Sequence, residues 1–144
     1  MVDFGGARMI EVGAALPERV FEIDRGLLVA YANASGDQNP IHQNEEFALS
    51  VGLPNVIAHG MLTMALVGKY VTDWAGGSAS VKEFGARFVK PVIVPAGEKV
   101  DLTVSATVTE VSEGKISLTL SAPRSIWDRL IDDKVQVRAI LDLA

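Results

Sequence analysis

Asp37 and His42 lie five positions apart in the run Tyr-Ala-Asn-Ala-Ser-Gly-Asp-Gln-Asn-Pro-Ile-His, which covers residues 31–42. Gly36 and Pro40 discourage a continuous helix through this run, so we expect a loop that presents its side chains. An imidazole that titrates near neutral pH can take a proton from water, and a carboxyl group can protonate a developing enolate carbon; the two roles can also be exchanged. The pair therefore predicts proton transfer beside a carbonyl group.

Each of these residues also has a simpler interpretation. Asp37 alone would more often be a loop residue whose carboxylate accepts hydrogen bonds from nearby amides, and His42 alone an ordinary loop histidine. Their occurrence together in one loop favours catalysis. We assign Asn39 to the substrate site as a residue that orients the loop, although a turn-former before Pro40 explains it equally well.

His59 and Gly60 open the most apolar segment of the chain about twenty residues later. The first amides of a helix have no partner inside it, and glycine leaves them accessible. An enolate needs a hydrogen-bond donor and no Arg or Lys lies inside the motif, so Gly60 is a candidate oxyanion donor, with a simple helix-start glycine as the alternative.

Four further residues are candidate substrate contacts. We expect His59 to pack or bond locally, and Met61 and Met64 to lie in the core, with Met64 adaptable enough to line a tunnel. Arg87 is a candidate phosphate contact, although solvated surface charge is the more common role for an arginine.

The helices that must position these residues have clear start and stop signals. Asp24 predicts a cap for a helix over 25–35, and Asn44 predicts a cap for a shorter helix that Gly52 ends. Residues 60–74 are apolar nearly all round, which predicts a buried helix ended by Gly76. Its small residues Ala65 and Gly68 predict the close approach of another backbone.

The remaining elements are predicted strands, because the apolar residues alternate with a period of two. Strands are expected at 19–23, 79–93, 100–111, 116–121 and 135–143, whereas residues 1–15 are expected to form a loose arm and 123–131 fit no element well. Consecutive strands joined by tight turns pair antiparallel, and a curved sheet around the buried helix would cover it. We predict one α+β domain over residues 1–144.

Composition limits the partners. The chain has 13 basic and 18 acidic side chains, a net charge of −5, and no cysteine. This balance argues against a nucleic-acid binder, and the lack of cysteine excludes disulfides. No segment reaches the ~20 apolar residues that span a bilayer, and the N-terminus does not read as a signal peptide, so we expect a cytoplasmic protein.

At this point the motifs resemble a known family. The run Tyr31-Ala32-x-x-Ser35-Gly36-Asp37-x-Asn39-Pro40-Ile41-His42, with Gly52 and His59-Gly60-Met61-Leu62-Thr63, resembles the hydratase-2 signature of the MaoC-like (R)-specific enoyl-thioester hydratases and dehydratases. The segment with Arg87-Phe88, Pro91-Val92 and Pro95-Ala96-Gly97-Glu98 is similar to another family segment. Length and order also resemble the catalytic subunit of actinobacterial (3R)-hydroxyacyl-ACP dehydratases.

The resemblance implies a hotdog fold, in which a curved sheet wraps one long helix, and reversible syn addition of water to a trans-2-enoyl thioester carried on CoA or acyl carrier protein. It implies that the residues matching Asp37 and His42 activate the water and that the amide matching Gly60 polarises the thioester carbonyl. It implies no cofactor, and a homodimer or a heterodimer with a related hotdog subunit. Some members carry a serine at the position of Gly68, so any contact from that serine is missing here, or is made by Thr63 or a partner.

Three other functions compete with the hydratase prediction. Hotdog thioesterases usually place a carboxylate on the central helix, and residues 60–70 contain none. A non-catalytic acyl-thioester-binding subunit would not need Asp37 and His42. A metal site formed by Asp37, His42 and His59 is weakly supported because two of its three ligands share one loop, so we predict no metal.

Overall fold

The computed structural model describes residues 2–4, 8–77, 81–88, 91–112, 115–121 and 135–142, and it describes the side chains of 10–77, 81–85 and 91–111. The elements, in chain order, are β1 (Val2–Phe4), β2 (Arg8–Ile10), β3 (Arg19–Ile23), α1 (Arg25–Ser35), the 3-10 turn η1 (Pro40–His42), α2 (Glu45–Ser50), α3 (Gly60–Ala75), β4 (Val81–Phe88), β5 (Val100–Ser112), β6 (Lys115–Ser121) and β7 (Val135–Asp142).

Among the described residues, one antiparallel sheet of five strands has the order β3-β5-β6-β7-β4. The neighbours β5, β6 and β7 follow each other in sequence, as consecutive strands commonly do in a sheet. β4 departs from this order, because it pairs with β7 at the far edge and not with β5, which follows it. Within the described residues, β3 and β4 are therefore the two edge strands of this sheet.

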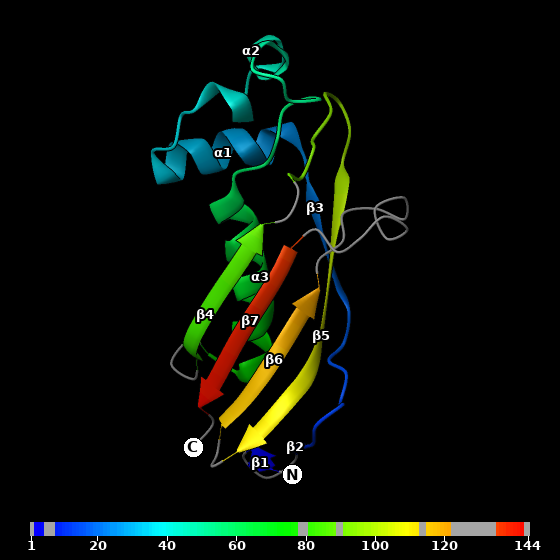
Figure 1. The fold of residues 1–144 in the computed structure, drawn as a ribbon. Helices are drawn as coiled ribbons and strands as arrows, with labels where there is room; N and C mark the ends of the chain where they lie inside the picture. The colour runs from blue at the N-terminus through cyan, green and yellow to red at the C-terminus, as the bar shows by residue number, and fades with distance from the viewer. Residues whose placement is uncertain are drawn as a thin grey trace.

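Helix α3 lies against one face of the curved sheet and contacts β4 and β7, as Figure 1 shows. α1 and α2 gather near the end of the sheet at which α3 begins (Figure 1). This is the predicted α+β architecture, a curved antiparallel sheet around one long helix.

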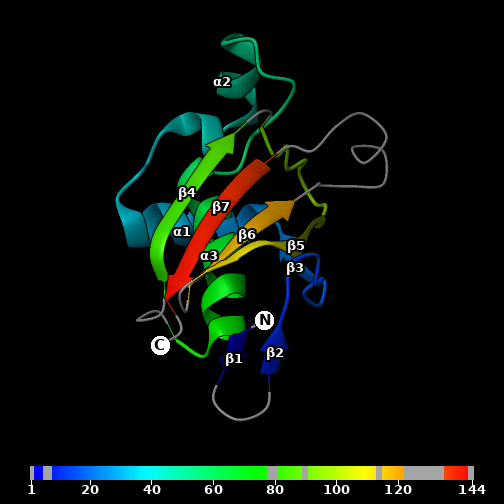
Figure 2. The ribbon, with the colours of Figure 1, turned by 60° about the horizontal axis from the view of Figure 1, so that its bottom comes forward.

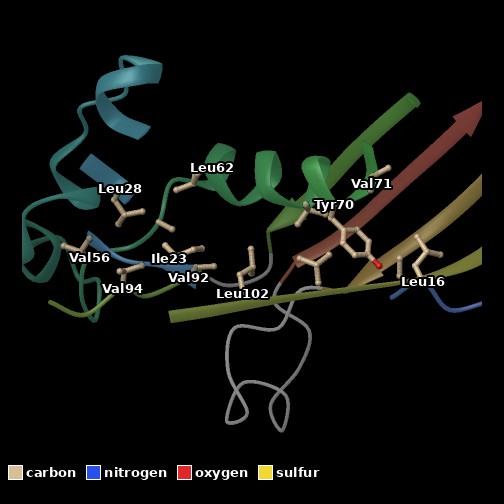
Figure 3. Close-up of a cluster of buried hydrophobic side chains, with 14 of the residues drawn as sticks. Leu16, Ile23, Leu28, Val56, Leu62, Tyr70, Val71, Val92, Val94 and Leu102 are labelled. Carbon is tan, nitrogen blue, oxygen red and sulfur yellow. The ribbon is translucent and has the colours of Figure 1, made fainter. Parts of the chain in front are cut away.

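The core forms where α3 meets the sheet, and Figure 3 shows side chains from distant segments converging there. On β5, Leu102, Val104, Ala106 and Val108 are all buried, as the period-two pattern predicts. From α3, Leu62, Val67, Tyr70 and Val71 point into the same core, which these fully or nearly fully buried side chains hold together by hydrophobic contact.

The predicted helix caps are confirmed. Asp24 Oδ1 accepts a hydrogen bond of 2.8 Å from Leu27 N–H, and Asn44 Oδ1 accepts one of 2.9 Å from Phe47 N–H. Gly36, with φ 81°, ends α1 in the left-handed conformation that glycine adopts without a steric penalty. The bounds of α1 thus follow from local chemistry alone.

The expected loose arm over residues 1–15 is wrong in part, because Val2 pairs with Ile10 in the hairpin of β1 and β2 (Figure 2). Gly5 and Gly6, on which that expectation rested, lie outside the described residues. The irregular stretch 123–131 lies outside the described residues.

The prediction that α3 is buried on all sides is also corrected. Met61 is 62% exposed, and Ala65 and Lys69, each one turn further along, are exposed as well. Residues four apart share one helix face, so α3 has one face that no described residue covers. At Gly68 the close neighbour is the ring of Phe84 in β4 and not another backbone.

Within the described residues, no helix is both long and apolar enough to cross a bilayer.

Candidate active site

The loop between α1 and η1 is held by short-range hydrogen bonds from its own polar side chains. Asn39 N–H donates to Asp37 Oδ1 at 3.1 Å, and Ile41 N–H donates to Asn39 Oδ1 at 3.1 Å. These are Asx-turns, in which a side chain replaces a backbone acceptor. One carboxylate oxygen of Asp37 is therefore engaged by the loop, while the other, Oδ2, faces His42.

His42 is only 7% exposed, and a short hydrogen bond orients its ring. Its Nδ1 lies 2.7 Å from the carbonyl oxygen of Ile57, so Nδ1–H donates and the neutral ring carries its lone pair on Nε2. Nε2 lies 4.0 Å from Asp37 Oδ2. This distance is too long for a direct hydrogen bond and suits one water molecule that touches both groups.

The carbonyl group of Ile57, which holds the ring of His42, belongs to a short stretch of paired backbone that the sequence did not reveal. Val94 N–H donates to Val56 O and Ala58 N–H to Val92 O, both at 2.8 Å, so residues 56–58 run beside 92–94. Arg25 joins α1 to this paired backbone, because its Nε donates to Val94 O at 2.6 Å. Its guanidinium also donates to Asn55 Oδ1 at 2.9 Å and lies 3.8 Å from Glu45 Oε2, so one side chain contacts three segments whose proximity no sequence motif specifies.

His59 lies beneath both catalytic candidates and is 1% exposed. Its ring stacks on that of His42 with centroids 3.9 Å apart, and it meets Tyr31 edge-on at 4.8 Å. Its Nε2 lies 3.2 Å from the backbone oxygen of Asp37, which makes Nε2–H the donor, and its buried Nδ1 has no hydrogen-bond partner among the described residues.

Burial holds the pKa of His59 below its usual value of 6.5, and the nearby His42 lowers this pKa further. The hydrogen bond to the backbone of Asp37 and the charge of its carboxylate act in the opposite direction and are outweighed. A neutral ring is consistent with the geometry, since a proton on Nδ1 would be a buried charge without a hydrogen-bond acceptor.

Gly60 is the first residue of α3 and is exposed. The helix ladder begins at Thr63, whose N–H donates to His59 O at 3.2 Å, and no described residue accepts a hydrogen bond from the amide of Gly60. The helix start therefore offers a donor directly beside the buried histidine, at the end of the helix where the dipole favours negative charge.

The other candidates divide into those near the loop and those elsewhere. Asn39 is exposed, and its side chain orients the loop by accepting the hydrogen bond from Ile41 N–H. Met61 is exposed and not in the core as expected, whereas Met64 is half-buried. Thr63 is buried and its hydroxyl lies 3.5 Å from His59 O. Arg87 belongs to β4, but its side chain lies outside the described ones.

Asp37, His42 and His59 come together more closely than the sequence suggested, with one potential ligand atom from each within 4.8 Å of the others. The nitrogens available to a metal are Nε2 of His42 and Nδ1 of His59, since the other two face carbonyl groups. Ring lone pairs lie in the ring planes, and these two rings are stacked only 24° from parallel. That arrangement does not direct both lone pairs at one point, so the absence of a metal stays our prediction.

Comparison with known proteins gives consistent results. The profile of the MaoC-like domain matches residues 15–123. The chain is 32% identical over 122 residues to the 3-oxo-4,17-pregnadiene-20-carboxyl-CoA hydratase beta subunit of Mycobacterium tuberculosis, covering 85% of this chain and 92% of that one.

Two solved structures are similar over most of the chain. A MaoC-like dehydratase matches with a TM-score of 0.87 and 32% identity, covering 94% of this chain and 41% of the other. The ChsH1–ChsH2 complex from Mycobacterium tuberculosis matches with a TM-score of 0.80 and 29% identity, covering 94% of this chain and all of the matched chain.

The curved sheet around α3 defines a hotdog protein, as the sequence predicted. The chain belongs to the MaoC-like family.

Proposed function

We propose that this protein catalyses the reversible addition of water to trans-2-enoyl thioesters, giving (3R)-hydroxyacyl thioesters. The observation that carries this proposal is the 4.0 Å separation of His42 Nε2 and Asp37 Oδ2, with the lone pair of Nε2 set by the bond to Ile57. The relatives are named as a hydratase subunit and a dehydratase, which supports the same reaction class.

The geometry supports His42 as the base. Nε2 takes one proton from the water as its oxygen bonds to C3, and Asp37 Oδ2 accepts a hydrogen bond from the other hydrogen and fixes its orientation. The electron pair of the C2=C3 bond moves towards the thioester, whose oxygen gains negative charge. The imidazolium then returns a proton to C2, and because one group takes and gives the proton, both additions occur on one face.

Gly60 supplies the donor for the thioester oxygen in this mechanism. Its amide stands at the start of α3, and preorganised donors of this kind contribute up to roughly 4 kcal/mol to transition-state stabilisation. The imidazole of His59 fills the space beneath His42, so the helix start and the catalytic loop are in contact. In the reverse direction the same groups would dehydrate a (3R)-hydroxyacyl thioester.

Thioester hydrolysis is the second candidate, and the position of the acidic residue on α3 argues against it. Asp73 lies near the end of the helix opposite Gly60 and accepts hydrogen bonds from Arg19 and Lys69 at 2.7 and 3.0 Å. This carboxylate is engaged in ion pairs and lies at the other end of α3 from the amide of Gly60, the proposed donor. Release of free thiol, measured with a chromogenic disulfide, would reveal hydrolysis.

A partner hotdog subunit is part of the proposal. The face of α3 that carries Met61 and Ala65 is exposed, and large exposed apolar groups mark contact surfaces. The relatives named a beta subunit and a two-component complex support pairing, with a second copy or with a related subunit. Activity that appears only after mixing with a second subunit would exclude the homodimer.

The carrier of the substrate is CoA or an acyl carrier protein, and we expect no cofactor and no metal. Metal analysis of the purified protein should find no stoichiometric metal, and hydration should survive treatment with a chelator. Bound stoichiometric metal that is needed for activity would contradict this part of the proposal.

The experiment that tests the reaction compares wild type with Asp37→Asn and His42→Gln. Loss of enone absorbance from a short trans-2-enoyl-CoA reports hydration, and we expect each variant to lower kcat by roughly 10²–10⁴-fold. Circular dichroism should show that both variants keep the fold. Activity near that of wild type in both variants would remove them from the mechanism.

A further inference from the structure

His59 makes contacts that no single structural role requires. Its one imidazole touches the backbone of Asp37, the ring of His42 and the ring of Tyr31, and its own backbone precedes Gly60. α1, the catalytic loop, η1 and the start of α3 therefore meet at this residue. It was assigned above to substrate binding, but 1% exposure leaves little surface for a substrate.

The unpaired nitrogen shows that packing alone does not account for a histidine here. A buried polar atom without a partner costs stability, and Nδ1 of His59 is such an atom among the described residues. Phenylalanine would fill nearly the same space and keep both ring contacts without that cost. Only the N–H of Nε2, which donates to the carbonyl oxygen of Asp37, requires a histidine.

That hydrogen bond acts on the part of the loop that carries the carboxylate. Asp37 is otherwise held by bonds within its own loop, to Ser35 Oγ and from Asn39 N–H, and its side chain is 52% exposed. The bond from His59 links it to residues that belong to α3. The contact spans 22 positions in sequence, whereas the loop bonds span two.

His59 also supports the ring of His42 by stacking against it. His42 is oriented at one nitrogen by Ile57, and the face of its ring rests on His59. A neutral His59 can support this ring without repelling the charge that His42 acquires when it takes a proton. The low pKa of His59, caused chiefly by burial, keeps it in that state.

We propose that His59 is a positioning residue that holds Asp37 and His42 at their working separation and couples both to the Gly60 end of α3. This inference rests on the proposed hydratase function. His59 transfers no proton and touches no reacting atom; it acts through the backbone of Asp37 and the ring of His42.

The test uses His59→Phe and His59→Gln in the full chain. Phe keeps the ring and removes the donor, whereas Gln offers a side-chain amide donor and removes the ring. We expect His59→Phe to lower kcat by about 10–100-fold with KM within about threefold of wild type, because one misplaced group lowers the rate without removing substrate contacts. His59→Gln should recover part of the lost kcat. The melting temperature of His59→Phe should equal or exceed that of wild type, since the unpaired nitrogen is gone.

Tyr70→Phe is the matched control, because Tyr70 also lies on α3 and donates to a backbone carbonyl, that of Pro17, at 2.8 Å. This variant should lower the melting temperature and leave kcat unchanged, the opposite pattern to His59→Phe.

The outcomes separate this inference from the function on which it rests. Full kcat in His59→Phe, or no recovery in His59→Gln, would overturn the positioning role while the hydratase activity stands. Loss of the folded state in both variants would show a structural role and overturn it as well. A folded dimeric wild type without hydration activity would overturn the proposed function, and this inference with it.

Discussion

The proposed catalytic loop, residues 36–42, and the central helix α3 are held in place by different kinds of interaction. The loop is exposed over most of its length and relies on hydrogen bonds between close neighbours, such as those accepted by Asp37 and Asn39. α3 buries Leu62, Val67 and Val71 against the sheet, while its charged residues, Lys69 and Asp73, are exposed. Substitutions in the loop should therefore change the rate, and substitutions in the core should change stability.

The double variant Asp37→Asn/His42→Gln tests whether the loop acts as one unit. When two groups hold the same water, the effects of removing them on kcat are not additive. The kcat of the double variant should therefore lie within about threefold of that of the slower single variant. Stopped-flow or extended-time enone absorbance measures the three rates. Strictly additive losses, as a product of the two single effects, would show that the residues act on different steps.

Leu102→Ala tests the other side of the comparison. Leu102 is fully buried on β5, so its truncation should lower the free energy of unfolding by about 2–5 kcal/mol through lost burial and a cavity. Urea denaturation measures this loss, and kcat per folded molecule should stay within about twofold of wild type. A large fall in kcat with little loss of stability would break the distinction between scaffold and loop.

Asn39→Ala should have an effect of intermediate size. Removing the acceptor for Ile41 N–H releases η1, and losing a cap of this kind costs about 0.5–2 kcal/mol locally. We expect kcat to fall about tenfold while the melting temperature changes little, because the loop is exposed. Asn39→Ser retains a capping oxygen and is the control. Equal losses in both variants would assign Asn39 to substrate contact in place of loop orientation.

The pH dependence of stability should differ between wild type and His59→Phe. The pKa of His59 is below 6.5 in the folded state, so the unfolded state binds more protons there and the stability of wild type falls as the pH decreases through and below 6.5. The neighbouring titratable residues Asp37 and His42 remain in both proteins, so the difference between the two curves reports the removal of His59. Denaturant unfolding between about pH 5 and 8 measures it, with a limit of about 1.4 kcal/mol per pH unit. Parallel curves would contradict the depressed pKa.

Gly68→Ala should have the smallest effect and the opposite sign. A Cβ at this position would lie 3.5 Å from the ring of Phe84, which is an ordinary contact distance, and alanine in a helix interior is favoured over glycine by about 0.5–1 kcal/mol. We expect a small gain in thermal stability with unchanged kcat. A loss of stability would show that the packing of α3 against β4 has no room for a methyl group.

Local chemistry explains what the sequence could predict. Asp24 and Asn44 fix the starts of α1 and α2 because a cap is decided by a few adjacent residues, and the loop of Asp37 and His42 follows from Gly36. The family resemblance added the hotdog fold, which the structural comparisons confirm.

Contacts between distant segments explain what the sequence could not predict. The burial of His59 depends on Tyr31 and His42, and nothing in the residues next to it signals either contact. The edge position of β4 depends on pairing with a strand about fifty residues later. The exposure of Met61 could not be predicted, because an apolar helix face indicates only that something packs against it. The pattern does not say whether the packing partner is another part of the same chain.

The most direct test of the central claim is hydration of a short trans-2-enoyl-CoA by the purified protein, alone and mixed with a related hotdog subunit, followed by chiral analysis of the product. If the imidazole of His42 and the carboxylate of Asp37 share one water beside the Gly60 amide, enone absorbance will fall and the product will be the (3R)-hydroxyacyl thioester. Unchanged absorbance with folded protein, or a (3S) product, would contradict it.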